Sequence, residues 1–352
     1  MDDYFAFGKI PDGIDEIWAK KQINDFMKQA RMMSKPDKCI VCGKKTTRFC
    51  NSHSVPQMVL KNIAENGQVM QANGLMGADI IDIDKGLKNS GTFQFICQEC
   101  DSTLFQTYEN PDNIRKDKLS DKLLGEIALK DVLLMLSKRN VEREIYRKGS
   151  ELGRVEGVET IFETQTLDES DYCDEMKLYL SIGDNSSNCF QVVFHTVLPY
   201  VTPIAVQTAL VLQNDLEGIE INNIYDYSPD VRMQNIHISV FPLEDSTVVI
   251  MFYHKRDKNY RRLLHQFNCL SEEKKLCYIN YWIFKYTENY FFAPSFKRVI
   301  EENPKLVQLS RENNELPNLG YVNLMTMLQY EPVKIEEVPN LLKSEYAISR
   351  KK

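Results

Sequence analysis

Long apolar runs are missing from this 352-residue sequence. The longest, such as Val192 to Val201, fall far short of the roughly 20 residues that a helix needs to span a bilayer. The first residues, MDDYFAFGKIPDG, carry acids where a secretory signal would have a basic region before an apolar run. The sequence therefore predicts a cytoplasmic protein that does not enter a membrane.

An excess of positive charge is also missing. The net charge of -7 argues against a surface coated for nucleic acid, because Lys and Arg supply most of the affinity for phosphate backbones. Without a phosphate-binding glycine loop or a G-x-S-x-G motif, nucleotide hydrolysis and serine hydrolase chemistry have no support. Histidines are few, and those without a partner at metal spacing are predicted to be structural: His195, His237, His254 and His265.

Cysteines are present, and their spacing is informative. Four of the nine form two C-x2-C pairs, CIVC (Cys39 and Cys42) and CQEC (Cys97 and Cys100). Zinc prefers four soft or borderline ligands in a tetrahedron, and each pair on a tight turn supplies two thiolates. The two pairs together predict a structural zinc site, whereas free core thiols or a redox pair are the alternative. The remaining thiols follow no ligand pattern, except for Cys50.

A second ligand set competes with the four thiolates. Cys50 and His53 form a C-x2-H pair, which with CIVC would make a compact local finger. We favour the four-thiolate set, because the compact finger leaves the well-spaced pair Cys97 and Cys100 without a metal.

The periodicity of apolar residues predicts an α+β protein, in which a small N-terminal zinc-binding module precedes a larger mixed domain. Apolar residues at helical spacing predict a leader helix within 1–35 and a long helix over 119–146. Between residues 157 and 253, six β-branched and aromatic runs predict a mostly antiparallel sheet: VETIFET, KLYLSI, CFQVVFH, IAVQTALVL, IHISVF and TVVIMFY. Helices are expected again over 259–352, one of them capped by Ser271. The zinc module is expected to occupy 36–115 and the α+β domain 116–352.

The motifs of the module follow a distinctive order: a Cys pair, then S-H-S-V-P around His53, then a Cys pair that opens a helix and is followed by Asp101. This order resembles the HNH endonuclease superfamily, whose ββα-metal (treble-clef) core is often braced by a zinc ion on four cysteines. More closely, SHSVPQMVLKNIAENGQV with TFQFICQECDSTLFQTYE is similar to a group of bacterial proteins with an HNH-like finger before a larger mixed domain. The resemblance covers Asp37 to Pro111.

The resemblance implies a catalytic site. His53 would be the general base, and a divalent ion, Mg²⁺ or Mn²⁺, would stabilise the charge on the phosphate. Asp101 would lie near that ion, with Glu109 as a helper, because carboxylates are hard oxygen donors. The alternative is that His53 is a buried structural histidine or a hydrogen-bond partner of the zinc site.

The chain departs from the family pattern at three places. Ser52 stands where an Asp or His metal ligand is common, and Asp101 stands where His or Asn is common. No clear candidate stands for the middle asparagine, although Asn73 and Asn89 lie in the right interval. Two hypotheses follow: an HNH-like protein that binds or cleaves DNA or RNA, as a metal-dependent endonuclease in defence or DNA metabolism, and a non-catalytic zinc-scaffolded adaptor whose C-terminal domain binds a protein or small-molecule partner.

Two basic segments bear on these hypotheses. Lys35 to Lys61 holds six Lys or Arg and only one acid, as a phosphate-facing surface would. The segment HKRDKNYRR, over 254–262, combines five Lys or Arg with Tyr253 and Tyr260, which offers charge for phosphates and rings for stacking. The alternative for this second segment is a solvated turn between a strand and a helix.

Overall fold

A computed structural model describes residues 16–46, 48–72, 81–151, 157–312 and 334–348. Its centre is a seven-stranded sheet in the order β3-β2-β9-β6-β7-β8-β5, in which all neighbours are antiparallel. The strands are β2 (Gln68–Ala72), β3 (Ile81–Gly86), β5 (Phe190–Leu198), β6 (Ile204–Leu210), β7 (Ile236–Pro242), β8 (Thr247–His254) and β9 (Tyr290–Phe292). The predicted α+β class with an antiparallel sheet is confirmed.

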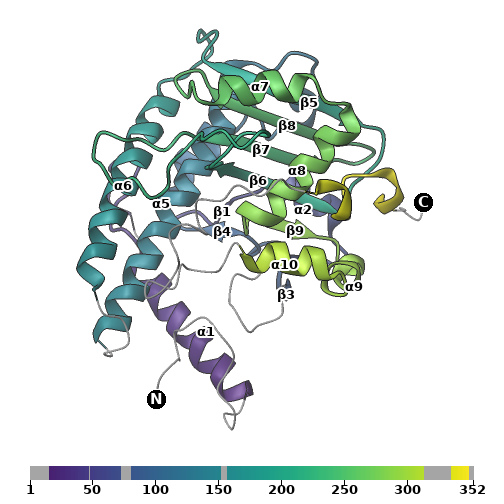
Figure 1. Ribbon diagram of the computed structural model, residues 1–352. Coiled ribbons are helices and arrows are strands. Elements are labelled where there is room, and N and C mark those ends of the chain that lie inside the picture. The colour runs from purple at the N-terminus through teal and green to yellow at the C-terminus, as the bar shows by residue number, and fades with distance from the viewer. Residues whose placement is uncertain (1–15, 47, 73–80, 152–156, 313–333, 349–352) are drawn as a thin grey trace.

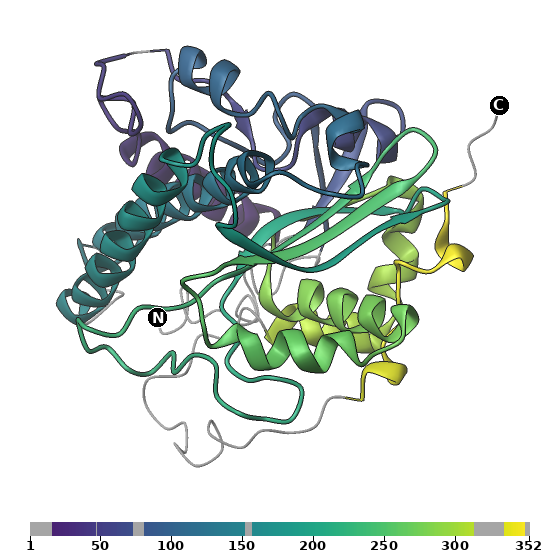
Figure 2. The ribbon, with the colours of Figure 1, turned by 90° about the horizontal axis from the view of Figure 1, so that it is seen from above.

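Both faces of the sheet are buried, so β6 and β7 are buried at every residue. One face packs on α7 (Tyr260–Asn268), α8 (Glu272–Tyr286) and α10 (Pro304–Glu312) through one hydrophobic cluster. The other face packs on α5 (Asp121–Glu151), α6 (Val158–Leu180) and the cysteine-bearing segment through a second cluster. Figure 2 shows the sheet between these two layers.

The prediction of strands at the first two runs is wrong. VETIFET and most of KLYLSI lie in α6, which lies alongside α5 (Figure 1). No Gly or Pro interrupts residues 158–180, so one helix can run through both segments. Packing of Met176 and Tyr179 into the second cluster then outweighs the weak strand preference of the β-branched residues.

The C-terminal region contains a strand that the sequence did not predict. Ser271 caps α8 as predicted, since its side chain accepts a hydrogen bond from the backbone N–H of Lys274. The helix ends at Tyr286, and β9 follows, inserted between β2 and β6. Short helical pieces complete this region: η1 (Pro294–Phe296), α9 (Lys297–Glu301), η2 (Ile335–Glu337) and η3 (Ser344–Tyr346).

The N-terminal region begins with the predicted leader helix, α1 (Glu16–Met33). The segment that follows contains β1 (Ser52–His53), α2 (Gln57–Ile63), β4 (Thr92–Phe93), α3 (Gln98–Leu104) and α4 (Pro111–Ile114). Between its two Cys pairs, β2 and β3 leave the segment and extend the large sheet, because Met70 pairs with Phe292. The helices in the described part of the chain include no candidate for a membrane span.

Candidate metal centre and its surroundings

Four cysteines from two distant segments meet at one point. The sulfur atoms of Cys39, Cys42, Cys97 and Cys100 all lie within 4.8 Å of one another. The distance is 3.7 Å from Cys39 Sγ to Cys100 Sγ and 3.8 Å from Cys42 Sγ to Cys97 Sγ. Zinc at about 2.3 Å from each sulfur of a regular tetrahedron requires sulfur–sulfur distances of about 3.8 Å. The four thiols therefore fit a zinc ion.

Local sequence explains how each pair is presented. In the first pair, Gly43 adopts a positive φ of 69° directly after Cys42, and its N–H donates to the carbonyl of Cys39 at 2.9 Å. In the second pair, Cys97 is the N-cap residue of α3 and Cys100 lies in the first turn of that helix. A tight turn and a helix start each direct two sulfur atoms to the same side of the backbone.

Backbone pairing brings the two pairs together. The N–H of Ile40 donates to the carbonyl of Phe95, and the N–H of Cys50 donates to the carbonyl of Ile96. The N–H of Cys97 also donates to the sulfur of Cys39 at 3.3 Å. The residues just before the second Cys pair therefore lie beside Ile40 and Cys50, which brings the two pairs together.

The thiols differ in their ease of deprotonation. Burial raises the pKa of Cys39, but N–H groups of Cys42, Cys97 and Val41 outweigh it and lower the pKa to about 7. Burial raises the pKa of Cys100 far above its ordinary value. A bound metal would replace the protons of such thiols, because the thiolate is the ligand.

The compact-finger alternative finds no support in the geometry. Among the described residues, the four thiols are the only group of three or more His, Cys, Asp or Glu side chains placed to share a metal. Cys50 instead donates from its sulfur to Asp101 Oδ2 at 3.2 Å, and burial, followed by the charge of Asp101, raises its pKa to about 12.

His53 and Asp101 lie on neighbouring elements in the order that the resemblance implies. His53 is on β1, which pairs with β4, and α3 with Asp101 follows. The ring Nε2 of His53 lies 2.9 Å from the carbonyl oxygen of Leu87, and burial lowers the pKa of His53. Asn89 lies in the β3–β4 turn, and Asn73 falls outside the described residues. The catalytic roles of His53 and Asp101 stay predictions.

A buried lysine that the sequence did not single out contacts Asp101. Lys130, on α5, is 1% exposed, and its Nζ lies 2.9 Å from Ser52 Oγ and 3.1 Å from Asp101 Oδ1. Burial lowers the pKa of Lys130. Burial also raises the pKa of Asp101, but the charge of Lys130 and the hydrogen bonds from Ser52, Lys130 and Cys50 together outweigh it and hold this pKa below its usual value. Glu109 Oε1 is farther away, at 3.9 Å, and burial raises its pKa. The only sequence signal was a lysine on the apolar face of a predicted helix.

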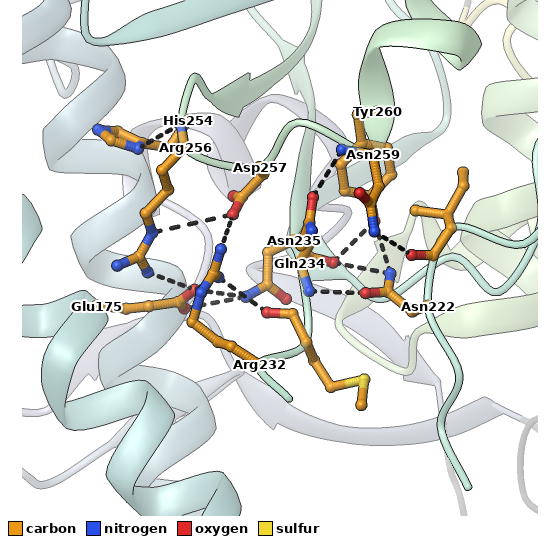
Figure 3. Close-up of polar contacts among 12 residues, drawn as sticks. Glu175, Asn222, Arg232, Gln234, Asn235, His254, Arg256, Asp257, Asn259 and Tyr260 are labelled. Atoms are coloured by element: carbon orange, nitrogen blue, oxygen red, sulfur yellow. Dashed lines mark hydrogen bonds and ion pairs between the residues drawn. The ribbon is translucent and has the colours of Figure 1, made fainter. Parts of the chain in front are cut away.

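In the second basic segment, Arg256, Asp257 and Tyr260 make contacts within the chain (Figure 3). Arg256 donates to Glu175 Oε1 at 3.0 Å, and Arg232 reaches both Glu175 and Asp257. The ring of Tyr260 is fully buried and its hydroxyl donates to the carbonyl of Gln234 at 2.9 Å. The buried ring of Tyr260 is not available for stacking, and Arg256 ties the turn between β8 and α7 to α6 instead of pointing freely into solvent.

A histidine–aspartate pair lies between the sheet and α5, with His237 on β7 and Asp131 on α5. His237 Nδ1 is 2.7 Å from Asp131 Oδ2, and its Nε2 is 3.4 Å from the hydroxyl of Tyr179. The rings of His237 and Phe252 stack at 4.9 Å. Because His237 and Asp131 are each no more than 2% exposed, no substrate reaches this pair in the described arrangement.

No family model, curated protein or solved structure matches this chain.

Proposed function

We propose that this chain is a zinc-braced, HNH-like protein that binds nucleic acid through its N-terminal module without needing to cleave it. The observation that carries the proposal is a basic hollow beside the four-cysteine cluster. This surface hollow has a volume of about 730 Å³ and is lined by Lys35, Pro36, Asp37, Lys45, Thr46, Arg48 and Phe49.

The charge of the hollow supports a phosphate ligand. Within the described part of the chain, Lys35, Lys45 and Arg48 form no ion pair, whereas the neighbouring Lys44 is neutralised by Glu99 at 2.9 Å. Three cations and a single carboxylate, Asp37, thus line the hollow of a protein whose net charge is -7. Local cations of this kind attract a phosphate backbone even when the net charge is negative.

Binding is tested by the fluorescence anisotropy of labelled single-stranded DNA, duplex DNA and RNA, measured over a range of salt concentrations. Replacing Lys35, Lys45 and Arg48 together by Gln should weaken binding and reduce the salt slope by roughly two to three, at about 0.7–0.9 per lost phosphate contact. The matched control replaces Lys255, Lys258 and Arg261 by Gln. Equal losses in both triple variants, or no binding by the parent chain, would reject the proposal.

Endonuclease activity is the second candidate. The arrangement that favours it is His53 on the first strand of a two-stranded ribbon that is followed by a helix with Asp101. In this reading His53 is the base that activates water.

The nuclease candidate is tested with plasmid DNA and RNA in the presence of Mg²⁺ or Mn²⁺. Cleavage by the parent chain that is lost in His53→Ala supports it. Cleavage by both, or by neither, removes it and leaves the binding function, which the anisotropy experiment tests separately. A protein- or ligand-binding adaptor remains the outcome if nucleic acid neither binds nor is cleaved.

A further inference from the structure

The carboxylate of Asp101 has few free acceptor positions. Its Oδ1 receives hydrogen bonds from Ser52 Oγ at 2.5 Å and Lys130 Nζ at 3.1 Å, and its Oδ2 receives one from Cys50 Sγ at 3.2 Å. The side chain of Asp101 is 24% exposed and that of Glu109 is 44% exposed. Asp101 and Glu109 are thus partly exposed to solvent, and both lie near the buried ammonium of Lys130.

The ammonium of Lys130 is held in place by several independent contacts. It lies 3.5 Å from the centre of the Phe105 ring, in cation–π geometry, in addition to its contacts with Ser52 and Asp101. One helical turn earlier, Glu126 accepts the backbone N–H groups of Thr107 and Tyr108 at 2.8 and 3.0 Å. Glu126 and Lys130 are four residues apart and lie on the same face of α5. Both contact the segment that follows α3, and these contacts fix the position of the lysine.

A divalent ion does not fit Asp101 in this arrangement. Lys130 Nζ lies 3.1 Å from Asp101 Oδ1 and 3.9 Å from Glu109 Oε1, so an ion that drew on both carboxylates would lie close to a fixed positive charge. Mg²⁺ also requires oxygen ligands at about 2.0–2.1 Å, in nearly octahedral geometry. Within the described ranges, no group of three or more His, Cys, Asp or Glu side chains that includes Asp101 is placed to share an ion, so Glu109 is the second carboxylate on which an ion there would depend.

We propose that Lys130 is a resident cation, which takes the place of a divalent metal at the Asp101–Glu109 pair and thereby couples α5 to the zinc module. Lys130 is a positioning residue, because its buried Nζ orients Asp101 and does not reach the surface. The inference rests on the proposed binding function in one respect: both hold that the module acts without a catalytic ion.

The inference is tested by Mn²⁺ binding to zinc-loaded full-length protein, followed by electron paramagnetic resonance. The variants are Lys130→Met, Asp101→Asn and the double variant. Lys122→Met is the matched control, since Lys122 is on the same helix but forms an exposed pair with Asp184 at 2.9 Å. Zinc content and circular dichroism, measured on every variant, report whether the module is folded.

We expect the parent chain and Lys122→Met to bind Mn²⁺ weakly, with no change on Asp101→Asn. Lys130→Met should bind it at least about a hundredfold more tightly, because a fixed unit charge a few ångström away repels a divalent ion strongly. The double variant should lose this gain. Tight Mn²⁺ binding by the parent chain that Asp101→Asn abolishes would overturn the inference.

A folded Lys130→Met that gains no Mn²⁺ would overturn it as well. If Lys130→Met does not fold, the comparison of the parent chain with Asp101→Asn decides alone, since only a true metal ligand would change Mn²⁺ binding. None of these results depends on nucleic acid, so failure here and failure of the proposed function are distinguishable.

Discussion

Substitution of Cys97 by Ser should remove zinc, whereas the same substitution at Cys50 should not. Cys97 supplies one of four sulfur atoms that lie within 4.8 Å of one another. Cys50 only donates to Asp101 Oδ2, and a serine hydroxyl can make the same hydrogen bond. The pair of variants therefore separates the four-thiolate site from the compact finger.

The magnitude follows from the number of ligands. Structural zinc sites bind with ~10–16 kcal/mol, so each of four thiolates accounts for ~3–4 kcal/mol, or a factor of roughly 10²–10³ in affinity. Cys97 is the N-cap residue of α3 without a side-chain cap hydrogen bond, and Ser is a better N-cap. Loss of stability in Cys97→Ser would consequently report the metal and not a damaged helix end.

The assay is competition for zinc with a chromophoric chelator, combined with thermal unfolding in the presence and absence of EDTA. We expect the parent chain and Cys50→Ser to hold one zinc per chain and to lose stability in EDTA. Cys97→Ser should release its zinc to the chelator and unfold at the same temperature with or without EDTA. The reasoning is refuted if Cys97→Ser retains zinc at parental affinity, or if Cys50→Ser alone releases it.

Further predictions concern the fold. Glu175→Ala should lower the free energy of unfolding in urea by ~1–3 kcal/mol, because Arg232 and Arg256 lose their buried partner and keep only Asp257, whereas Asp174→Ala, at an exposed pair on the same helix, should leave it nearly unchanged. Burial and then nearby cations lower the pKa of His254 from 6.5 to about 4. The unfolded chain thus binds more protons between these values, so stability should fall by up to ~3 kcal/mol as pH drops from 6.5 to 4, and His254→Gln should flatten that part of the profile. Gly91→Ala, whose Cβ would collide with the ring of Phe291, should cost ~2–4 kcal/mol, against ~1 kcal/mol for Gly67→Ala, where φ is also positive but the space is open; equal costs would contradict the collision.

The four-cysteine cluster and most of the sheet could be predicted from the sequence, because both depend on short local patterns. A C-x2-C pair presents two thiolates within one turn, whatever the rest of the chain does. Runs such as IAVQTALVL and TVVIMFY become β6 and β8, where they are buried on both faces of the sheet. The cap at Ser271 is equally local.

Two kinds of feature were not predictable in this way. Helix α6 replaced two expected strands because its partner is α5, and helix–helix packing outweighs the modest preferences of β-branched residues. Strand β9 is only Tyr290–Phe292, too short for a periodic signal, and it exists because β2 and β6 supply hydrogen-bond partners on either side.

The sequence by itself determined which residues can hold a metal, and the tertiary structure decided what surrounds them. From the sequence, the carboxylate of Asp101 was expected to be available as a metal ligand, because no cation lies near it in the chain. The fold brings Lys130 to 3.1 Å from it, from 29 residues farther along the chain. The reason is physical: a thiolate pair is fixed by local geometry, but a buried carboxylate takes its charge partner from whichever element packs against it, and only the packing of α5 on the zinc module specifies that partner.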